Sequence, residues 1–329
     1  MKKIFCLLLS CLMISLQMIG QPTTYPTSFT VAQDGSGNFK TIQEAVNAVR
    51  DLSQQQVTIH IKKGVYKEKL VIPSWKCRIS LLGEDKDSTI ITNSDYSGKA
   101  YAGLDFVGRD KYSTYTSYTV LIQGNDCTAE NLTIRNDAGR VGQAVALHVE
   151  GDRFVMSNCK LMGNQDTLYA ATETSRQWYR DCFIEGTTDF LFGEATVVFQ
   201  RCTIKSLSNS YITAAATTAR QRFGFVFFDC TLVADSAAKK VFLGRPWRPN
   251  SKTVFLNTTM GDHIVKEGWN NWGNAENEKT VLYAEYQSVG PGGQAGQRVS
   301  WSRQLSAKQA KQYTFKHIFG DWEPAVNPQ

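Results

Sequence analysis

The sequence lacks the short motifs that mark the common hydrolase sites. It contains no G-x-S-x-G, no H-E-x-x-H and no C-x-x-C, and it has only 4 histidines. A serine nucleophile elbow and a helical zinc site are therefore not indicated. His60 and His148 lie in strand-like segments, VTIHIKKG and AVALHVEGD, where a lone histidine is more often structural than catalytic.

Long apolar runs are absent beyond the N-terminus. The opening MKKIFCLLLSCLMISLQMIGQ has two lysines, an apolar run and then small or polar residues, which predicts a signal peptide over residues 1–20. No other stretch approaches the roughly 20 apolar residues of a membrane helix. We therefore expect no membrane span and an exported protein, secreted, periplasmic or at the cell surface. Lipid attachment at Cys11 is the alternative, but the apolar run continues past this cysteine.

Blocks of like charge are also missing. The formal net charge is +6, including Lys2 and Lys3 of the predicted leader. No basic-aromatic stripe indicates a nucleic-acid partner. A mild positive balance suits a polyanionic substrate without identifying one.

What the sequence does contain is a repeated phrase built on cysteine. The copies are SNCKLMG at 157–163, RDCFIEG at 180–186, QRCTIKS at 200–206 and FDCTLVA at 228–234, with variants ENLTIRN at 130–136 and LNTTMGD at 256–262. An irregular repeat of this length is typical of a solenoid. Alternating β-branched and aromatic residues around the copies predict short strands.

Stacked turns of this kind form a parallel β-helix, with neighbouring strands about 4.8 Å apart. The cysteines would then form a ladder of buried thiols, with disulfides between them as the alternative. TIQEAVNAVRDL carries a capping box at Thr41 and Glu44, which predicts a helix closing the N-terminal end. SAKQAKQY, with Ser306 and Gln309, predicts a short helix near the other end. We expect one domain over residues 28–329, with GPGG at 290–293 as a loop.

Polar side chains interrupt several strand-like segments of the solenoid. They are Gln143, Gln165, Asp166, Asp189 and Arg245, and the aromatic Trp247 follows Arg245 in FLGRPWRP. Asp189 lies in GTTDFLFGEA, and a carboxylate among such apolar residues is costly to bury unless it is paired. Arg245 is the candidate partner.

The spacing of the two aspartates indicates a shared site. Asp166 and Asp189 are 23 residues apart, as are Cys159 and Cys182. The aspartates should therefore occupy the same place on adjacent turns, about 5 Å apart. Gln143 falls roughly one turn before Gln165 by the same argument. A solvated polar ladder is the alternative interpretation.

Together these segments resemble the pectin methylesterases, or pectinesterases, of the secreted bacterial type. The resemblance rests on GQAVAL, GNQDTLYA, GTTDFLFGEA and LGRPW, and extends to TVAQDGSGNFKTIQEAV, GVYKEKLVI and YAEYQSVGPG. It implies an all-β, right-handed parallel β-helix that needs no metal or other cofactor, acts as a monomer and removes methyl esters from the polysaccharide pectin (homogalacturonan).

The resemblance also implies a role for each matching residue. Asp189 matches the nucleophile, Asp166 the general acid and base, Gln143 and Gln165 the oxyanion donors, and Arg245 the partner of Asp189. Trp247 and Trp269, the latter in GWNNW, match aromatic residues that line the sugar cleft.

Two other interpretations remain open at the level of sequence. A pectate lyase would need calcium carboxylates, and a polygalacturonase would need carboxylates flanking a glycosidic bond, for which adjacent aspartates have a retaining-type spacing. A solenoid adhesin or carbohydrate-binding module would use the aromatic residues alone.

Overall fold

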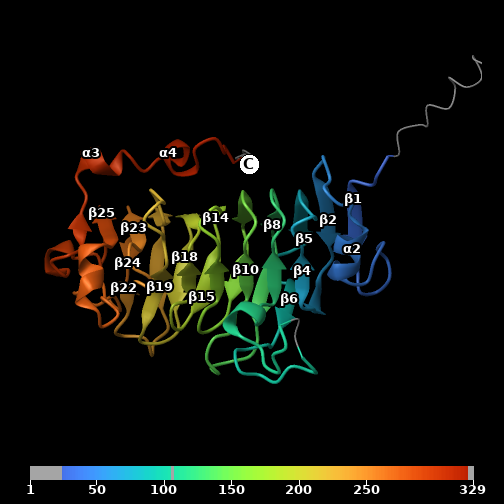
Figure 1. Ribbon diagram of the computed structural model, residues 1–329, viewed down its shortest axis with the longest axis horizontal. Coiled ribbons are helices and arrows are strands. Elements are labelled where there is room, and N and C mark those ends of the chain that lie inside the picture. The colour runs from blue at the N-terminus through green and yellow to red at the C-terminus, as the bar shows by residue number, and fades with distance from the viewer. Residues whose placement is uncertain (1–23, 105–106, 325–329) are drawn as a thin grey trace, which may run out of the picture.

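The structure is a computed structural model that describes residues 24–104 and 107–324. Within these residues the chain winds into an elongated solenoid of three parallel sheets, with 11, 8 and 7 strands (Figure 1). A complete turn adds one strand to each sheet. This is a right-handed parallel β-helix, so the predicted fold class is confirmed. The predicted signal peptide and Cys11 lie outside the described residues.

The strands of each sheet follow one another along the solenoid. Sheet A contains β1 (Ser28–Val31), β2 (Val57–Ile61), β5 (Ile79–Gly83), β8 (Thr128–Glu130), β11 (Phe154–Ser157), β14 (Arg176–Arg180), β17 (Thr196–Gln200), β20 (Phe225–Phe228), β23 (Lys252–Leu256), β25 (Leu282–Tyr286) and β26 (Arg303–Gln304). Sheet B contains β3 (Gly64–Lys67), β6 (Thr89–Asn93), β9 (Thr133–Asn136), β12 (Lys160–Met162), β15 (Phe183–Gly186), β18 (Thr203–Ser206), β21 (Thr231–Ala234) and β24 (Thr259–Met260). Sheet C contains β4 (Leu70–Ile72), β7 (Val120–Ile122), β10 (Leu147–Val149), β13 (Leu168–Ala170), β16 (Leu191–Gly193), β19 (Tyr211–Ala215) and β22 (Phe242–Gly244).

The repeated cysteine phrases lie where the chain turns from sheet A into sheet B. The residue before each cysteine has φ between 49° and 54°, a left-handed conformation that allows a tight turn and that Asn and Asp adopt most readily. The strands that follow pair in register, so the cysteines stack on consecutive turns. The ladder consists of Cys159, Cys182, Cys202 and Cys230. All four are at most 2% exposed and carry free thiols, as the repeat predicts.

Aromatic residues stack in register inside sheet A. Tyr179, Phe199, Phe227 and Phe255 come from four consecutive strands, β14, β17, β20 and β23. Successive ring centroids are 5.2, 4.5 and 4.2 Å apart, with nearly parallel planes. Because parallel pairing repeats the same residue position on each turn, one apolar position in the repeat becomes a continuous core.

The N-terminal helix begins as the sequence predicts but ends sooner. α2 (Ile42–Ala48) has the complete capping box of Thr41 and Glu44. The carboxylate of Glu68 also accepts hydrogen bonds from the first two backbone N–H groups, at 2.9 and 3.0 Å. The helix lies against β1, β2 and β4 and is seen at the N-terminal end of the solenoid in Figure 1.

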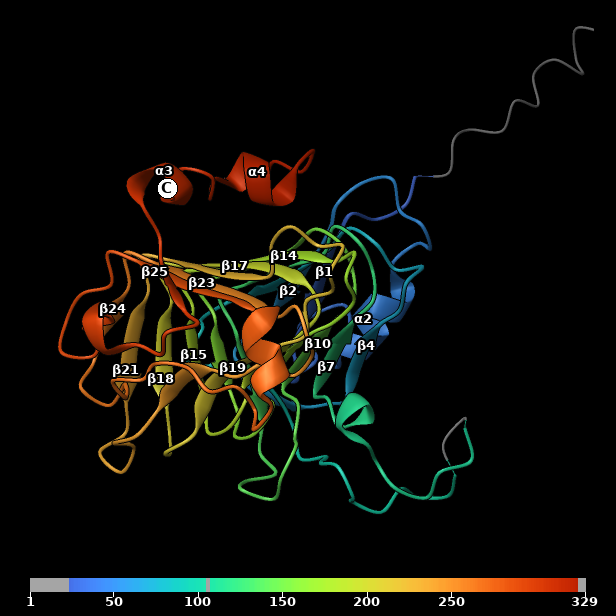
Figure 2. The same cartoon turned by 60° about the vertical axis from the view of Figure 1, so that its left-hand side comes forward.

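The C-terminal segment forms the short helix predicted at Ser306, but it then continues in a way that the sequence did not predict. Ser306 does cap α3 (Ala307–Ala310), and a second helix, α4 (Phe315–Phe319), follows. Both helices run back over sheet A, as Figures 1 and 2 show. The physical reason is that sheet A carries outward apolar side chains, among them Trp178 and Val226, which this segment covers.

Candidate active site

A cavity of about 430 Å³ lies over the outer face of sheet C. It is lined by Thr114, Tyr115, Gln143, Gln165, Asp166, Asp189, Phe192, Ala214, Arg245, Trp247 and Trp272. All five predicted catalytic residues are therefore brought together, although they are spread over about a hundred positions of the sequence. One of the two predicted aromatic residues, Trp247, is also present.

The register of sheet C explains why the polar residues meet. Leu168 of β13 pairs with Leu191 of β16, so Asp166 and Asp189, each two residues earlier, occupy equivalent positions on adjacent turns. Gln143 pairs directly with Gln165. The chain thus presents two amides and two carboxyl groups on three successive turns, as the 23-residue spacing predicts.

Both aspartates sit at a left-handed bend just before their strands. Asp166 has φ 66° and Asp189 has φ 49°. The backbone N–H of Asp166 donates to the carbonyl of Thr188, and that of Asp189 donates to the carbonyl of Tyr211. Aspartate adopts this conformation more readily than most residues. Main-chain bonds to the next turn therefore fix where each carboxyl group projects.

Asp189 and Arg245 form a bidentate ion pair. Nε and Nη2 of Arg245 donate to the two carboxylate oxygens at 3.0 and 2.6 Å. Asp189 is 5% exposed. Such a fork-to-fork pair fixes the plane of the carboxylate and favours its charged form. The pairing inferred from the sequence is therefore present.

The two carboxyl groups have different proton affinities. Burial, followed by the neighbouring charge of Asp189, raises the pKa of Asp166 to about 8. Burial also raises the pKa of Asp189, but the hydrogen bonds and charge of Arg245 oppose the rise. Asp189 is therefore the stronger acid of the pair. The arrangement therefore favours a protonated Asp166 next to an Asp189 whose charged form is stabilised by Arg245.

Aromatic rings form the floor beside these carboxyl groups. Phe192 stacks on Tyr169 with ring centroids 4.6 Å apart, and Trp247 meets Phe192 edge to face at 5.7 Å. Alternate residues of the same strands, such as Leu168 and Leu191, point into the solenoid core. The period of two in each strand thus separates the core from a flat apolar surface that can contact a ligand.

The prediction that Trp269 lines the cleft is wrong. Trp269 is 1% exposed and stacks on Tyr283 inside the core, with ring centroids 4.3 Å apart. It pairs with Gly244, and this register places it beneath the site. Trp272, three residues later in GWNNW, lies at a positive φ of 61°, is 38% exposed and lines the cavity instead.

Thr114 and Tyr115 also line the cavity, although nothing in the sequence pointed to them. They belong to η1 (Thr114–Thr116), in the long connection between β6 and β7 that projects from the solenoid in Figure 2. The ammonium group of Lys69 holds this connection, donating to Asp95 at 2.8 Å and to the carbonyl of Thr116 at 2.6 Å. This connection lies outside the repeated strands, so no sequence pattern indicates that its residues reach the cavity.

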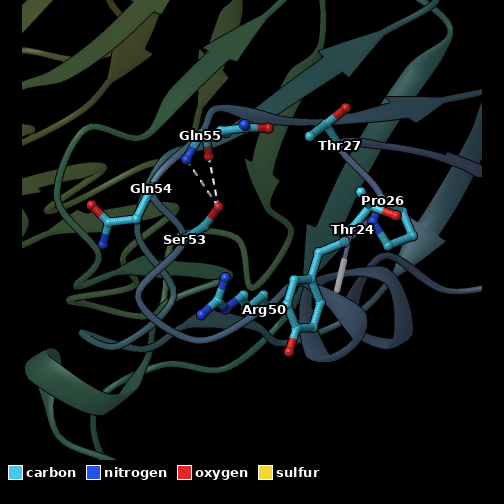
Figure 3. A pocket seen from close by; sticks show the side chains of 8 residues that line it. Thr24, Pro26, Thr27, Arg50, Ser53, Gln54 and Gln55 are labelled. Carbon is cyan, nitrogen blue, oxygen red and sulfur yellow. Dashed lines mark hydrogen bonds between the residues drawn. The ribbon is translucent and has the colours of Figure 1, made fainter. Parts of the chain in front are cut away.

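A second cavity, of about 380 Å³, lies at the N-terminal end (Figure 3). Its lining includes Arg50, Ser53, Gln54 and Gln55, and the Arg50 guanidinium lies 4.4 Å from the ring centroid of Tyr25. Its lining residues include no carboxyl side chain. We therefore take the cavity over sheet C, which contains Asp166 and Asp189, as the candidate active site.

Residues 24–104 and 107–324 contain neither a membrane-spanning helix nor a cluster of metal-binding side chains. None of their helices is long and apolar enough to cross a membrane. None of their His, Cys, Asp and Glu side chains gather in threes or more in a way that could hold a metal ion.

Comparisons with known proteins agree with this geometry. The family model described as Pectinesterase matches residues 28–321. The chain is 37% identical over 322 residues to "Probable pectinesterase/pectinesterase inhibitor 23" of Arabidopsis thaliana, covering 93% of this chain and 55% of that protein. The chain spans about half the length of the first curated relatives it matches.

Solved structures share the fold across almost the whole chain. The pectin methylesterase from carrot superposes with a TM-score of 0.82 at 34% identity, covering 91% of this chain and 94% of that one. A pectin methylesterase in complex with a hexasaccharide gives a TM-score of 0.77 at 32% identity, covering 92% and 99%.

Proposed function

Because the chain belongs to the pectinesterase family, we propose that it hydrolyses the methyl esters of galacturonate residues in pectin (homogalacturonan), giving pectate and methanol. The observation that carries this proposal is the pair Asp166 and Asp189, held on adjacent turns with unequal proton affinities beside two amide side chains. A carboxylic ester is cleaved by a group that attacks its carbonyl and a group that protonates its alkoxide.

In the first step the ionised carboxylate of Asp189 attacks the ester carbonyl carbon. Negative charge develops on the carbonyl oxygen, and the side-chain amides of Gln143 and Gln165 line the cavity where they can donate to it. As the tetrahedral intermediate collapses, Asp166 gives its proton to the departing methoxide, so methanol leaves. The product is an anhydride between Asp189 and the galacturonyl group.

In the second step the newly ionised Asp166 takes a proton from water. The resulting hydroxide attacks the galacturonyl carbonyl, again with the two amides facing the developing charge. The anhydride bond breaks, Asp189 leaves as a carboxylate paired with Arg245, and Asp166 is protonated again. The product leaves as galacturonic acid and loses its proton to the solvent, which gives the carboxylate of pectate. Both aspartates return to their starting states, and atoms and charge balance over the cycle.

Substrate recognition follows from the shape of the cavity. Trp247, Trp272 and Phe192 present ring faces and edges that match the C–H faces of pyranose rings. The hexasaccharide complex of a structural neighbour supports an oligosaccharide ligand for this surface. We propose that several sugar units bind along sheet C while one methyl ester meets the acid pair.

Export belongs to the same proposal. We propose that residues 1–20 direct the chain out of the cytoplasm, that it is of the secreted bacterial type, and that it acts as a monomer. The support is the sequence of the leader, with Lys2 and Lys3 before an apolar run. A polymeric substrate too large to enter a cell is consistent with an exported enzyme.

A glycoside hydrolase remains the alternative, because neighbouring carboxyl groups also suit retaining glycosidases. One assay separates the two. Purified protein incubated with highly methylated pectin should release methanol without new reducing ends or unsaturated products, and Asp189→Ala should abolish the release. New reducing ends without methanol would refute the esterase proposal in favour of glycosidic cleavage.

A further inference from the structure

Two aromatic rings hold the guanidinium group of Arg245. Its Cζ atom lies 4.0 Å from the ring centroid of Tyr211 and 3.7 Å from that of Trp272. Both distances are well inside the range of about 6 Å for a cation–π contact. We call Tyr211 and Trp272 the aromatic clamp.

The two rings of the clamp differ in their access to a ligand. Trp272 lines the cavity, so it can contact substrate as well as Arg245. Tyr211 is not among the residues that line it. Tyr211 begins β19, and its ring stacks on Phe242, its register partner in β22, with centroids 5.3 Å apart. The stack fixes the ring, which in turn lies over the guanidinium.

Tyr211 also reaches the other half of the ion pair. Its backbone carbonyl accepts the N–H of Asp189 at 2.8 Å, while its ring packs on Arg245. One residue therefore sets both the position of the carboxylate and the plane of the guanidinium that faces it. A bidentate pair requires the two planes to coincide, and a long arginine side chain without packed faces has many other conformations.

We propose that Tyr211 is a positioning residue that, through its ring face, holds Arg245 coplanar with Asp189 and so keeps Asp189 ionised for attack. This inference rests on the proposed function, since it deepens the role of the same site. It assigns to Tyr211 no contact with substrate.

The charged and titratable groups around Asp189 make the effect measurable. They are Arg245, Asp166, Tyr211 and Tyr283. Asp166 keeps its proton up to about pH 8, and burial raises the pKa of Tyr283 well above its ordinary value. The acid limb of the profile of kcat/KM against pH therefore reports Asp189.

The test compares Tyr211→Leu and Tyr211→Phe with the wild type. Without the ring, Arg245 is held less well and opposes less of the rise in the pKa of Asp189 that burial causes. Tyr211→Leu should therefore move the acid limb of the kcat/KM profile to higher pH by about half a unit or more. Tyr211→Phe keeps the ring face and should retain the wild-type limb. Tyr286→Leu, the same change in β25 of sheet A, is the matched control and should also keep it.

A second readout does not depend on turnover. The Nε–H proton of Arg245, identified by its loss in Arg245→Lys, should exchange slowly with water in the wild type and Tyr211→Phe and fast in Tyr211→Leu. Should Tyr211→Leu not fold, Tyr211→Met replaces it in both measurements.

Each outcome separates the two proposals. The positioning role would be overturned if the acid limb of the kcat/KM profile did not move in Tyr211→Leu. It would also be overturned if the limb moved equally far in Tyr211→Phe. A wild type that releases no methanol would overturn the proposed function, while the exchange measurement would still decide whether Tyr211 orders Arg245.

Discussion

Asp166 and Asp189 occupy equivalent positions on consecutive turns of the β-helix, yet only Asp189 is held by an arginine. The repeat makes the two residues alike in backbone conformation, with positive φ at both. Their difference comes from Arg245, which directly follows β22, two turns after Asp189. A symmetric scaffold thus acquires two chemically distinct carboxyl groups.

This asymmetry predicts different fates for the two amide variants. Asp189→Asn removes the nucleophile, so no covalent adduct can form. Asp166→Asn slows methanol departure and, more severely, the activation of the water that clears the anhydride. After mixing with methylated oligogalacturonate and quenching in acid, mass spectrometry should find an adduct on Asp166→Asn alone. An adduct on Asp189→Asn alone would reverse the two assignments.

The raised pKa of Asp166 predicts a pH-dependent gain in stability on its removal. The folded protein keeps this carboxyl protonated up to about pH 8, while the unfolded chain ionises it near 3.8. Stability is therefore lost as the pH rises from the lower value to the higher one. Asp166→Asn has no proton to lose, so its free energy of unfolding should exceed that of the wild type by ~1 kcal/mol or more near pH 8.

Thermal unfolding between about pH 4 and pH 8 measures this gain, which should vanish at the acid end. The matched control is Asp181→Asn, because Asp181 also has positive φ (53°) but pairs with Arg201 at the surface. A gain for Asp166→Asn that does not change with pH would contradict the assignment of a neutral Asp166.

The cysteine ladder predicts unreactive thiols in the native protein. Burial raises the pKa of Cys159, Cys182 and Cys202 well above its ordinary value, which removes the reactive thiolate. Thiol titration should therefore show little reaction until denaturant is added. The distance between stacked strands would also permit a disulfide between neighbouring cysteines. Disulfide-linked peptides in a non-reducing digest would therefore disprove the prediction that these four thiols are free.

The two tryptophans of GWNNW should separate binding from stability. Trp272→Ala removes a cavity wall and one ring of the aromatic clamp, so KM for methylated oligogalacturonate should rise and kcat should fall. Trp269→Ala leaves a hole in the core and should lower stability by about 3–5 kcal/mol. Steady-state kinetics and thermal unfolding of both variants test this pair. A stable Trp269→Ala protein with weakened substrate saturation would restore Trp269 to the cleft.

The sequence predicts those features that recur at a fixed position in each turn. The cysteine phrases reveal the turns, and the equal 23-residue spacings place Asp166 next to Asp189. The capping box at Thr41 is local, so it too can be read from the sequence. These predictions succeed because parallel pairing converts a difference in residue number into a position in space.

Features that depend on contacts between distant segments could not be predicted in this way. Nothing in GWNNW distinguishes the buried Trp269 from the exposed Trp272, since only pairing with the distant Gly244 places Trp269 in the core. Tyr115 reaches the cavity through a connection outside the repeat. Likewise, Phe315 packs against Trp178 on the outer face of sheet A, and Trp178 lies far away in the sequence.

The C-terminal segment has a consequence for how the molecule unfolds. In a solenoid each turn contacts only its neighbours, so turns can be lost one at a time from an open end. Here Phe315 packs on Trp178 of β14, and Arg176 binds the carbonyl of Phe319 and the carboxylate of Asp321. Residues 315–321 are thereby tied to a turn in the middle of the solenoid. Fraying from the C-terminal end must break these contacts, so we expect the turns from β14 onward to unfold together.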